Sequence, residues 1–268
     1  HVTLVDPAAC ESILSSTLPE SIGGLLSAEG QLIWIEDGAV QVHRVENGVE
    51  RAISLAHPGV ALHLDGEWLY ALTAATNDAG LGAEVWLERV PRSALNEDVI
   101  ASEPWISVAL EAGTRWSKAQ VKGSSERLLV SFWDPDSDAE SVGPTIRIHR
   151  TTGAQDLLSP NETTFAMFTL GSRVYAQRAK ELVVLSEGEE PRTLRGDLDN
   201  RQLVGVISEY AIVREPSAKL LLALPFSSDA PLQVADEQAA FAGVATSGND
   251  IYWVNWAQRL MTVSGVPQ

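Results

Sequence analysis

One unit recurs along this chain from end to end, and it limits the possible folds more than any other feature of the sequence. Each copy begins with a strand rich in small residues and continues through a turn into an apolar strand that often contains Trp or Tyr. A third strand then ends near an arginine, and a short outer strand follows. Six copies begin near residues 24, 59, 118, 165, 202 and 241. Their spacing averages about forty residues, the length of four β-strands with their turns.

The second strand of each copy is apolar on both of its faces. Residues 32–35 and 251–254 are unbroken runs of large apolar residues, whereas a strand with one face in water alternates between apolar and polar residues. Asp37 and Asp65 are each followed by glycine between apolar runs, which is the pattern of a tight hairpin turn. These patterns indicate sheets that are each packed between two neighbouring sheets.

The repeats therefore predict an all-β fold, a six-bladed β-propeller that forms a single domain over residues 1–268. The last copy stops after its third strand, and residues 11–18 resemble the outer strands elsewhere. We expect this N-terminal segment to complete the last blade, which would close the ring and remove an open sheet edge. A seven-bladed propeller and a pair of β-sandwiches are the alternatives.

Three segments resemble the YWTD repeats of six-bladed propellers, the LDL-receptor class B type, and related repeats of bacterial surface and periplasmic propellers. They are residues 251–256 (Ile-Tyr-Trp-Val-Asn-Trp), 32–37 (Leu-Ile-Trp-Ile-Glu-Asp) and 68–70 (Trp-Leu-Tyr). Arg44, Arg89 and Arg259 stand where that pattern has a strand ending near an arginine. The Thr-Asp of the motif is Val-Asn at 254–255 and Ile-Glu at 35–36. The resemblance implies the propeller fold rather than an activity, because propellers host unrelated functions.

The chain has 36 acidic and 19 basic residues, a formal net charge of −17. Such a surface repels phosphate backbones and anionic lipids, so nucleic acid and membrane surfaces are poor candidate partners. No apolar run approaches the roughly 18 residues of a membrane-spanning helix. Cys10 is the single cysteine, which excludes an internal disulfide and leaves a free thiol or a bond to another chain.

Two connections between second and third strands are longer than the others, residues 73–83 and 134–143. They occupy equivalent places in adjacent copies, so we expect them to lie side by side on one face of the ring. Long loops on a rigid scaffold are where binding residues are usually placed. The candidate binding residues of these loops are Asn77, Asp78, Asp134, Asp136, Asp138 and Glu140.

Asp134, Asp136 and Asp138 alternate along the second loop. Clustered carboxylate oxygens are the ligands that calcium prefers, and Asp-x-Asp-x-Asp opens known calcium loops. The helical calcium loop has glycine where Ala139 stands and glutamate where Thr145 stands. The two interpretations are therefore a calcium site formed by the three aspartates and an acidic loop in solvent.

Trp105, Arg115 and Trp116 lie in or beside the long link between the second and third copies. Exposed Trp and Arg are typical anchors of binding surfaces, and Trp buried between blades is the alternative. His63 falls within a first strand, where a histidine is more often a satisfied part of the core than a general base. The sequence contains no Gly-x-Ser-x-Gly, no P-loop and no His-Glu-x-x-His motif.

The two neighbouring loops and the lack of catalytic motifs favour a non-enzymatic binding module. It would hold a protein or carbohydrate ligand on one face of the propeller, with calcium as a candidate cofactor. Because the chain begins at His1 rather than methionine, we expect that an upstream segment has been removed or left out, and a signal peptide is one candidate for it. We expect the protein to be secreted, periplasmic or at the cell surface. The alternative is an enzyme, a propeller hydrolase of the lactonase or esterase type with a metal at the channel mouth. A structural subunit with an apolar patch on its outer edge is the third hypothesis.

Overall fold

The structure is a computed structural model that describes most of the chain. The described residues are 2–4, 23–28, 31–36, 38–44, 49–75, 84–97, 100–111, 114, 116–124, 126–133, 143–159, 164–171, 173–185, 190–227, 230–235, 244–247, 250–254 and 260–264. They belong to two compact units. We call Ile13–Thr163 the N-terminal unit, and His1–Ser12 together with Thr164–Gln268 the C-terminal unit.

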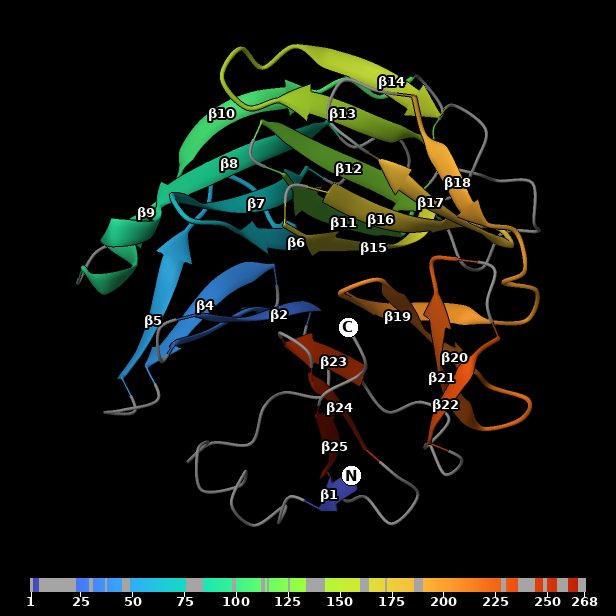
Figure 1. Ribbon diagram of the computed structural model, residues 1–268. Helices are drawn as coiled ribbons and strands as arrows, with labels where there is room; N and C mark the ends of the chain where they lie inside the picture. Colours follow the sequence, from blue (N-terminus) through green and yellow to red (C-terminus); the bar gives the residue numbers. More distant parts are fainter. Residues whose placement is uncertain are drawn as a thin grey trace. The chain divides into compact units, whose positions relative to one another are not determined.

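The N-terminal unit contains three sheets (Figure 1). The first sheet consists, in spatial order, of β2 (Gly23–Ala28), β3 (Gln31–Glu36), β4 (Ala39–Arg44), β5 (Val49–Ser54) and β9 (Ile100–Ala101). The second consists of β6 (Gly59–Leu64), β7 (Trp68–Ala74), β8 (Val85–Pro91) and β10 (Glu103–Val108). The third consists of β11 (Lys118–Gly123), β12 (Arg127–Trp133), β13 (Thr145–His149) and β14 (Gln155–Ser159).

The C-terminal unit also contains three sheets, each with four antiparallel strands (Figure 1). The fourth sheet consists of β15 (Thr164–Leu170), β16 (Arg173–Arg178), β17 (Glu181–Leu185) and β18 (Arg192–Arg195). The fifth consists of β19 (Gln202–Ile207), β20 (Tyr210–Glu215), β21 (Leu220–Pro225) and β22 (Leu232–Ala235). The sixth consists of β23 (Val244–Ser247), β24 (Asp250–Val254), β25 (Leu260–Ser264) and β1 (Val2–Leu4).

The nearly all-β architecture predicted from the repeats is confirmed, with five four-stranded antiparallel sheets and a sheet of five strands. The first three strands of each repeat fall where the sequence pattern predicted them. In the last sheet β1 pairs with β25, from Val2 opposite Val263 to Leu4 opposite Met261. The predicted closing strand, residues 11–18, lies outside the described residues.

Strand β7 shows why the second strands are apolar on both faces. Successive side chains of a strand point to opposite sides of the sheet. Leu69 and Ala71 belong to a core shared with the first sheet, whereas Tyr70 and Leu72 belong to a core shared with the third sheet. Each fully buried Leu contributes roughly 1.5–3 kcal/mol to the stability of the fold.

The segment that joins β8 to β10 was not predicted from the sequence. It contains a short 3₁₀ helix, η1 (Arg92–Asn96), and then β9, which pairs in parallel with β5 at the edge of the first sheet. Leu95 and Ile100 anchor the segment because both side chains are buried in the core between the first two sheets. The segment therefore acts as a strap that joins the second sheet to the first.

Candidate functional site

The second and third sheets run in the same direction, and this defines two ends of the pair. Gly123, the last residue of β11, lies against His63 near the end of β6, so the two first strands are aligned. We call the end where β6 passes into β7 and β11 passes into β12 the turn end. The opposite end, where β7 passes to β8 and β12 passes to β13, is the loop end.

Both long connections predicted to bind a ligand leave from the loop end. The first stem is fixed by a hydrogen bond that the Ala75 backbone N–H donates to the Glu84 carbonyl oxygen at 3.0 Å. In the second stem the Phe132 N–H donates to the Pro144 carbonyl oxygen at 3.1 Å. The candidate residues Asn77, Asp78, Asp134, Asp136, Asp138, Glu140 and Arg115 lie outside the described residues.

Gly143 follows the second loop and fits tightly beside its stem. A Cβ atom at this position would lie 1.8 Å from the Phe132 carbonyl oxygen, so only glycine fits without a backbone shift. Trp116 lies near the same stem, half-buried, with its ring edge-on to Phe132 at 5.2 Å between centroids. Phe132 is thus closely packed by Gly143 and Trp116 at the loop end.

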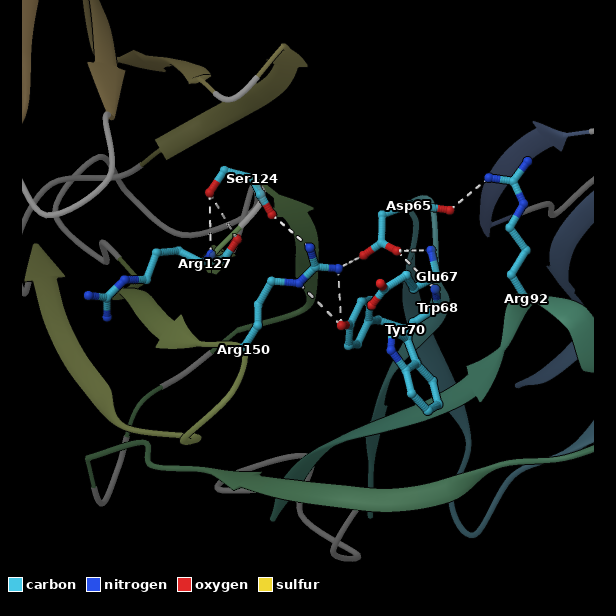
Figure 2. Close-up of polar contacts among 8 residues, drawn as sticks. All are labelled: Asp65, Glu67, Trp68, Tyr70, Arg92, Ser124, Arg127 and Arg150. Carbon is cyan, nitrogen blue, oxygen red and sulfur yellow. Dashed lines mark hydrogen bonds and ion pairs between the residues drawn. The ribbon is translucent and has the colours of Figure 1, made fainter.

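The turn end is organised by Asp65, which is the first residue of the predicted Asp–Gly turn. One carboxylate oxygen accepts hydrogen bonds from the backbone N–H groups of Glu67 at 2.7 Å and Trp68 at 2.8 Å (Figure 2). The other oxygen forms an ion pair with Arg150, which follows β13 in the third sheet. A local turn residue therefore also connects two sheets.

Arg150 makes several contacts that join the third sheet to the second (Figure 2). Its guanidinium donates to the Tyr70 hydroxyl at 3.2 and 3.1 Å and to the Ser124 carbonyl oxygen at 2.9 Å. The guanidinium carbon lies 5.2 Å from the centre of the Tyr70 ring. Burial raises the pKa of Tyr70 to about 12, so this hydroxyl stays protonated at neutral pH.

Next to this cluster, Arg89 of β8 lies against two tryptophans. Its guanidinium carbon is 4.3 Å from the ring centre of Trp68 and 5.7 Å from that of Trp105. Trp105 also packs against Tyr70 at 5.7 Å between centroids. The Arg89 side chain is 29% exposed and forms a 3.6 Å ion pair with Glu103, whose side chain is 68% exposed. We call Trp68, Arg89 and Trp105 the Trp–Arg ladder.

Trp105 thus lies within strand β10 rather than in a connecting link, where its position between repeats suggested it would be. Pro104 and exposed residues in this strand hide its β pattern in the sequence. The structure places Trp105 toward the turn end, beside Arg89, and Trp116 at the loop end, beside Phe132. The two tryptophans therefore do not form one surface.

His63 is buried between the second and third sheets, as its place in a first strand suggested. Burial lowers its pKa to about 3, and the positive charges of Lys122 and Arg150 add to the effect. Its Nε2 has no hydrogen-bond partner among the described residues, contrary to the expectation of a satisfied core histidine. A Cβ on Gly123 would lie 2.5 Å from that nitrogen, so the histidine requires glycine there.

Glu88 is a fully buried carboxylate that sequence analysis missed. It accepts hydrogen bonds from the Thr73 hydroxyl at 2.8 Å, the Ala56 N–H at 2.9 Å and the His57 N–H at 3.3 Å, and also from the Ser102 hydroxyl. These donors come from β7, from the connection between the first and second sheets, and from the strap. Glu88 therefore holds the strap in place, and nothing in its own strand pattern indicates those partners.

The described residues contain no group of three or more His, Cys, Asp or Glu side chains able to hold a metal ion. Among the same residues no helix has the length and apolar character to span a membrane.

Comparison with known proteins identifies the fold. No family model and no curated protein sequence matches the chain. Among solved structures, BamB from Moraxella catarrhalis is 14% identical with a TM-score of 0.56, and the match covers 90% of this chain and 71% of BamB. Nidogen in its complex with laminin is 11% identical with a TM-score of 0.53, and the match covers 87% of this chain and 89% of nidogen.

PorZ, a bacterial surface component of the type-IX secretion system of Porphyromonas gingivalis, is 13% identical with a TM-score of 0.51. That match covers 88% of this chain, but this chain spans only 30% of PorZ. These neighbours are β-propeller proteins of bacterial surface, periplasmic or extracellular origin. At such low identity the likeness establishes the fold alone, and the sheets described above are consistent with a propeller.

Proposed function

We propose that this protein is a non-enzymatic binding module of the β-propeller class that captures a protein or carbohydrate ligand at the loop end of its second and third sheets. The observation that carries the proposal is the common direction of these two sheets, because it brings the stems of both long connections to one end. A rigid scaffold that presents two long loops together is the usual arrangement of a binding site. The complex of nidogen with laminin gives a precedent for a protein ligand among proteins of similar fold.

The candidate ligand-binding residues are those of the two loops and the residues near them. At the loop end they are Asn77, Asp78, Asp134, Asp136, Asp138, Glu140, Arg115 and Trp116. Trp105, the remaining candidate from the sequence, lies toward the turn end and is not part of this loop-end site. We assign calcium to Asp134, Asp136 and Asp138, whose alternate spacing supplies three carboxylates within one short loop. In this proposal calcium neutralises the loop and orders it for the ligand.

The six sheets are proposed to be six blades with YWTD-like repeats, in one domain that is closed through the N-terminal segment. Support comes from the pairing of β1 with β25, which makes the first residues of the chain part of the last sheet. Removing residues 1–18 is then expected to lower the melting midpoint of the whole domain. An unchanged midpoint would contradict closure.

A secreted, periplasmic or cell-surface location follows from the same proposal. It is supported by the kind of protein that shares the fold, such as the bacterial surface component PorZ. Fractionation of the producing cells, with the protein followed by an antibody, tests it. Recovery in the cytoplasm would contradict this location.

The binding function is tested by replacing residues 134–142 with a short Gly-Ser linker. The variant is expected to lose its ligand in a pull-down from the extracellular or periplasmic fraction while its circular dichroism spectrum stays unchanged. Asp136→Asn is the matched test for calcium, and Asp156→Asn on the exposed part of β14 is its control. Calorimetry should show calcium binding to the native chain and the control but not to Asp136→Asn. Full ligand capture by the loop-replacement variant would overturn the proposal.

A further inference from the structure

The turn end, opposite the proposed ligand loops, carries a second surface with its own chemistry. We propose that the Trp–Arg ladder and the acidic residues beside it bind a basic, extended segment of a partner protein. This surface is formed by the second sheet alone and does not depend on the loops of the proposed function.

The first argument is that the tryptophans of the ladder already bind a cation. The face of an indole ring attracts a guanidinium or ammonium group because of its negative quadrupole. Arg89 satisfies this preference at 4.3 Å from Trp68 and 5.7 Å from Trp105. Both tryptophans are only partly buried, and Trp105 also packs against Tyr70. A further Arg or Lys side chain that reaches the exposed part of either indole would meet the same kind of cation-binding surface.

The second argument concerns which charges face the solvent. The Glu103 side chain is 68% exposed, and Glu67 at the β6–β7 turn is also exposed. In contrast, the Arg150 side chain is only 16% exposed and is engaged with Asp65, and Arg89 is engaged with the two indole rings and Glu103. Glu103 and Glu67 are therefore more exposed to an approaching partner than Arg89 and Arg150 are.

The third argument is the charge of the whole chain. A net charge of −17 steers cationic partners toward the protein and repels anionic ones. An acidic ligand for Arg89 would have to overcome this field and displace Glu103. This charge pattern favours a basic segment over an acidic peptide or an acidic sugar.

The test uses two short fluorescently labelled peptides that alternate Ser with Arg or Ser with Glu, and fluorescence anisotropy at increasing salt. The Arg peptide is expected to bind and to weaken as salt rises, and the Glu peptide is not. Glu103→Lys should weaken binding of the Arg peptide by roughly tenfold or more, because it reverses a charge beside the ladder. Glu209→Lys is the control, since it changes the net charge equally at an exposed turn of the fifth sheet.

Three outcomes would overturn the inference: no binding of the Arg peptide, tighter binding of the Glu peptide, or equal weakening by the two charge reversals. Trp105→Leu gives an independent check, because it removes one indole face without changing the charge. It should weaken binding while leaving the circular dichroism spectrum unchanged. The loop replacement at residues 134–142 should leave peptide binding intact, so failure of this inference and failure of the proposed function are separate results.

Discussion

The N-terminal unit and the C-terminal unit join neighbouring sheets by different chemistry. Between the second and third sheets the link is charged, with Arg150 bound to Asp65, Tyr70 and Ser124. Between the fourth and fifth sheets the central link is a neutral amide. Gln177 accepts a hydrogen bond from the Leu203 N–H at 2.7 Å and donates to the carbonyl oxygens of Ala179 at 3.0 Å and Arg201 at 2.8 Å.

The junction between the fourth and fifth sheets also has a charged link, which starts from Arg195 in the outer strand β18. Arg195 donates to the carbonyl oxygens of Pro225 and Ser227, both at 2.7 Å, and pairs with Asp197. The hydrogen bond from Arg195 lowers the pKa of Asp197. The comparison teaches that each junction needs a long side chain to satisfy polar groups of the adjacent sheet, but the residue type that does so is free to vary.

The largest expected effect is at the charged junction. Arg150→Met removes the partner of the largely buried Asp65 carboxylate and three further hydrogen bonds, so we expect a loss of about 3 kcal/mol in the free energy of unfolding. Urea unfolding followed by fluorescence measures it. Arg173→Met, at an exposed position of β16, is the matched control and should change stability by less than about 0.5 kcal/mol. Equal losses of unfolding free energy in the two variants would show that Arg150 does not stabilise the junction between the second and third sheets.

The next effect is a pH dependence that belongs to the charged junction. Folded His63 binds a proton only near pH 3, whereas the unfolded histidine binds one near 6.5. The unfolded state therefore holds more protons between these values, and stability is full above pH 6.5 and falls as the pH drops, by up to about 1.4 kcal/mol per pH unit. His63→Leu should flatten the profile between pH 7 and about 5 relative to the native chain. A variant profile parallel to the native one would contradict this linkage.

The same measurement separates the two junctions. The pKa of Asp197 is lowered, so its contribution is present above the usual aspartate range and is lost only as the pH falls below that range. Asp197→Asn should therefore leave the profile between pH 7 and about 5 unchanged. The two variants together locate the neutral-to-acid dependence at the charged junction.

A smaller effect is expected at the neutral junction. Gln177→Met keeps the volume of a side chain that is 5% exposed, but it leaves the Leu203 N–H and the Arg201 carbonyl without this partner. We expect a loss of about 2 kcal/mol, since a buried polar group without a partner costs roughly 1–3 kcal/mol. Gln177→Glu sharpens the test because it keeps the acceptor and loses the donor. In thermal unfolding, the melting temperature of Gln177→Glu should not exceed that of the native chain. A higher melting temperature would contradict the role of the amide.

The smallest expected effect is that of salt. Raising NaCl to about 1 M should reduce the difference in the free energy of unfolding between the native chain and Arg150→Met by a few tenths of a kcal/mol. The reason is that the Arg150–Asp65 ion pair is only partly shielded from solvent. The corresponding difference in the free energy of unfolding between the native chain and Gln177→Met should stay constant, since this substitution changes no charge. If salt reduces both differences equally, the two junctions do not differ in the way their side chains suggest.

The sequence predicted those parts of the fold that depend on local pattern. Strands such as β3, β7 and β24 have apolar residues on both faces, and this pattern needs no knowledge of distant residues. The Asp–Gly turn at Asp65 was predicted for the same reason. In contrast, β10 contains Pro104 and exposed residues, and β9 has only two residues, so neither gives a local signal.

Candidate functional residues could be predicted from their residue type, but their contacts with residues far away in the sequence could not. The tryptophan at 105 was proposed as an anchor from residue type, but its pairing with Arg89 and Trp68 depends on three different strands. The buried carboxylate of Glu88 was missed because its donors come from residues 14 to 32 positions away. Likewise, Gln177 is not part of the repeat pattern, although its side chain forms hydrogen bonds that join the fourth and fifth sheets.

The pairing of β1 with β25 sets the order in which this protein is completed. Val2 precedes its partner Val263 by most of this sequence, so β1 cannot pair until β25 has also been synthesised. A nascent chain released early keeps an unpaired N-terminal strand.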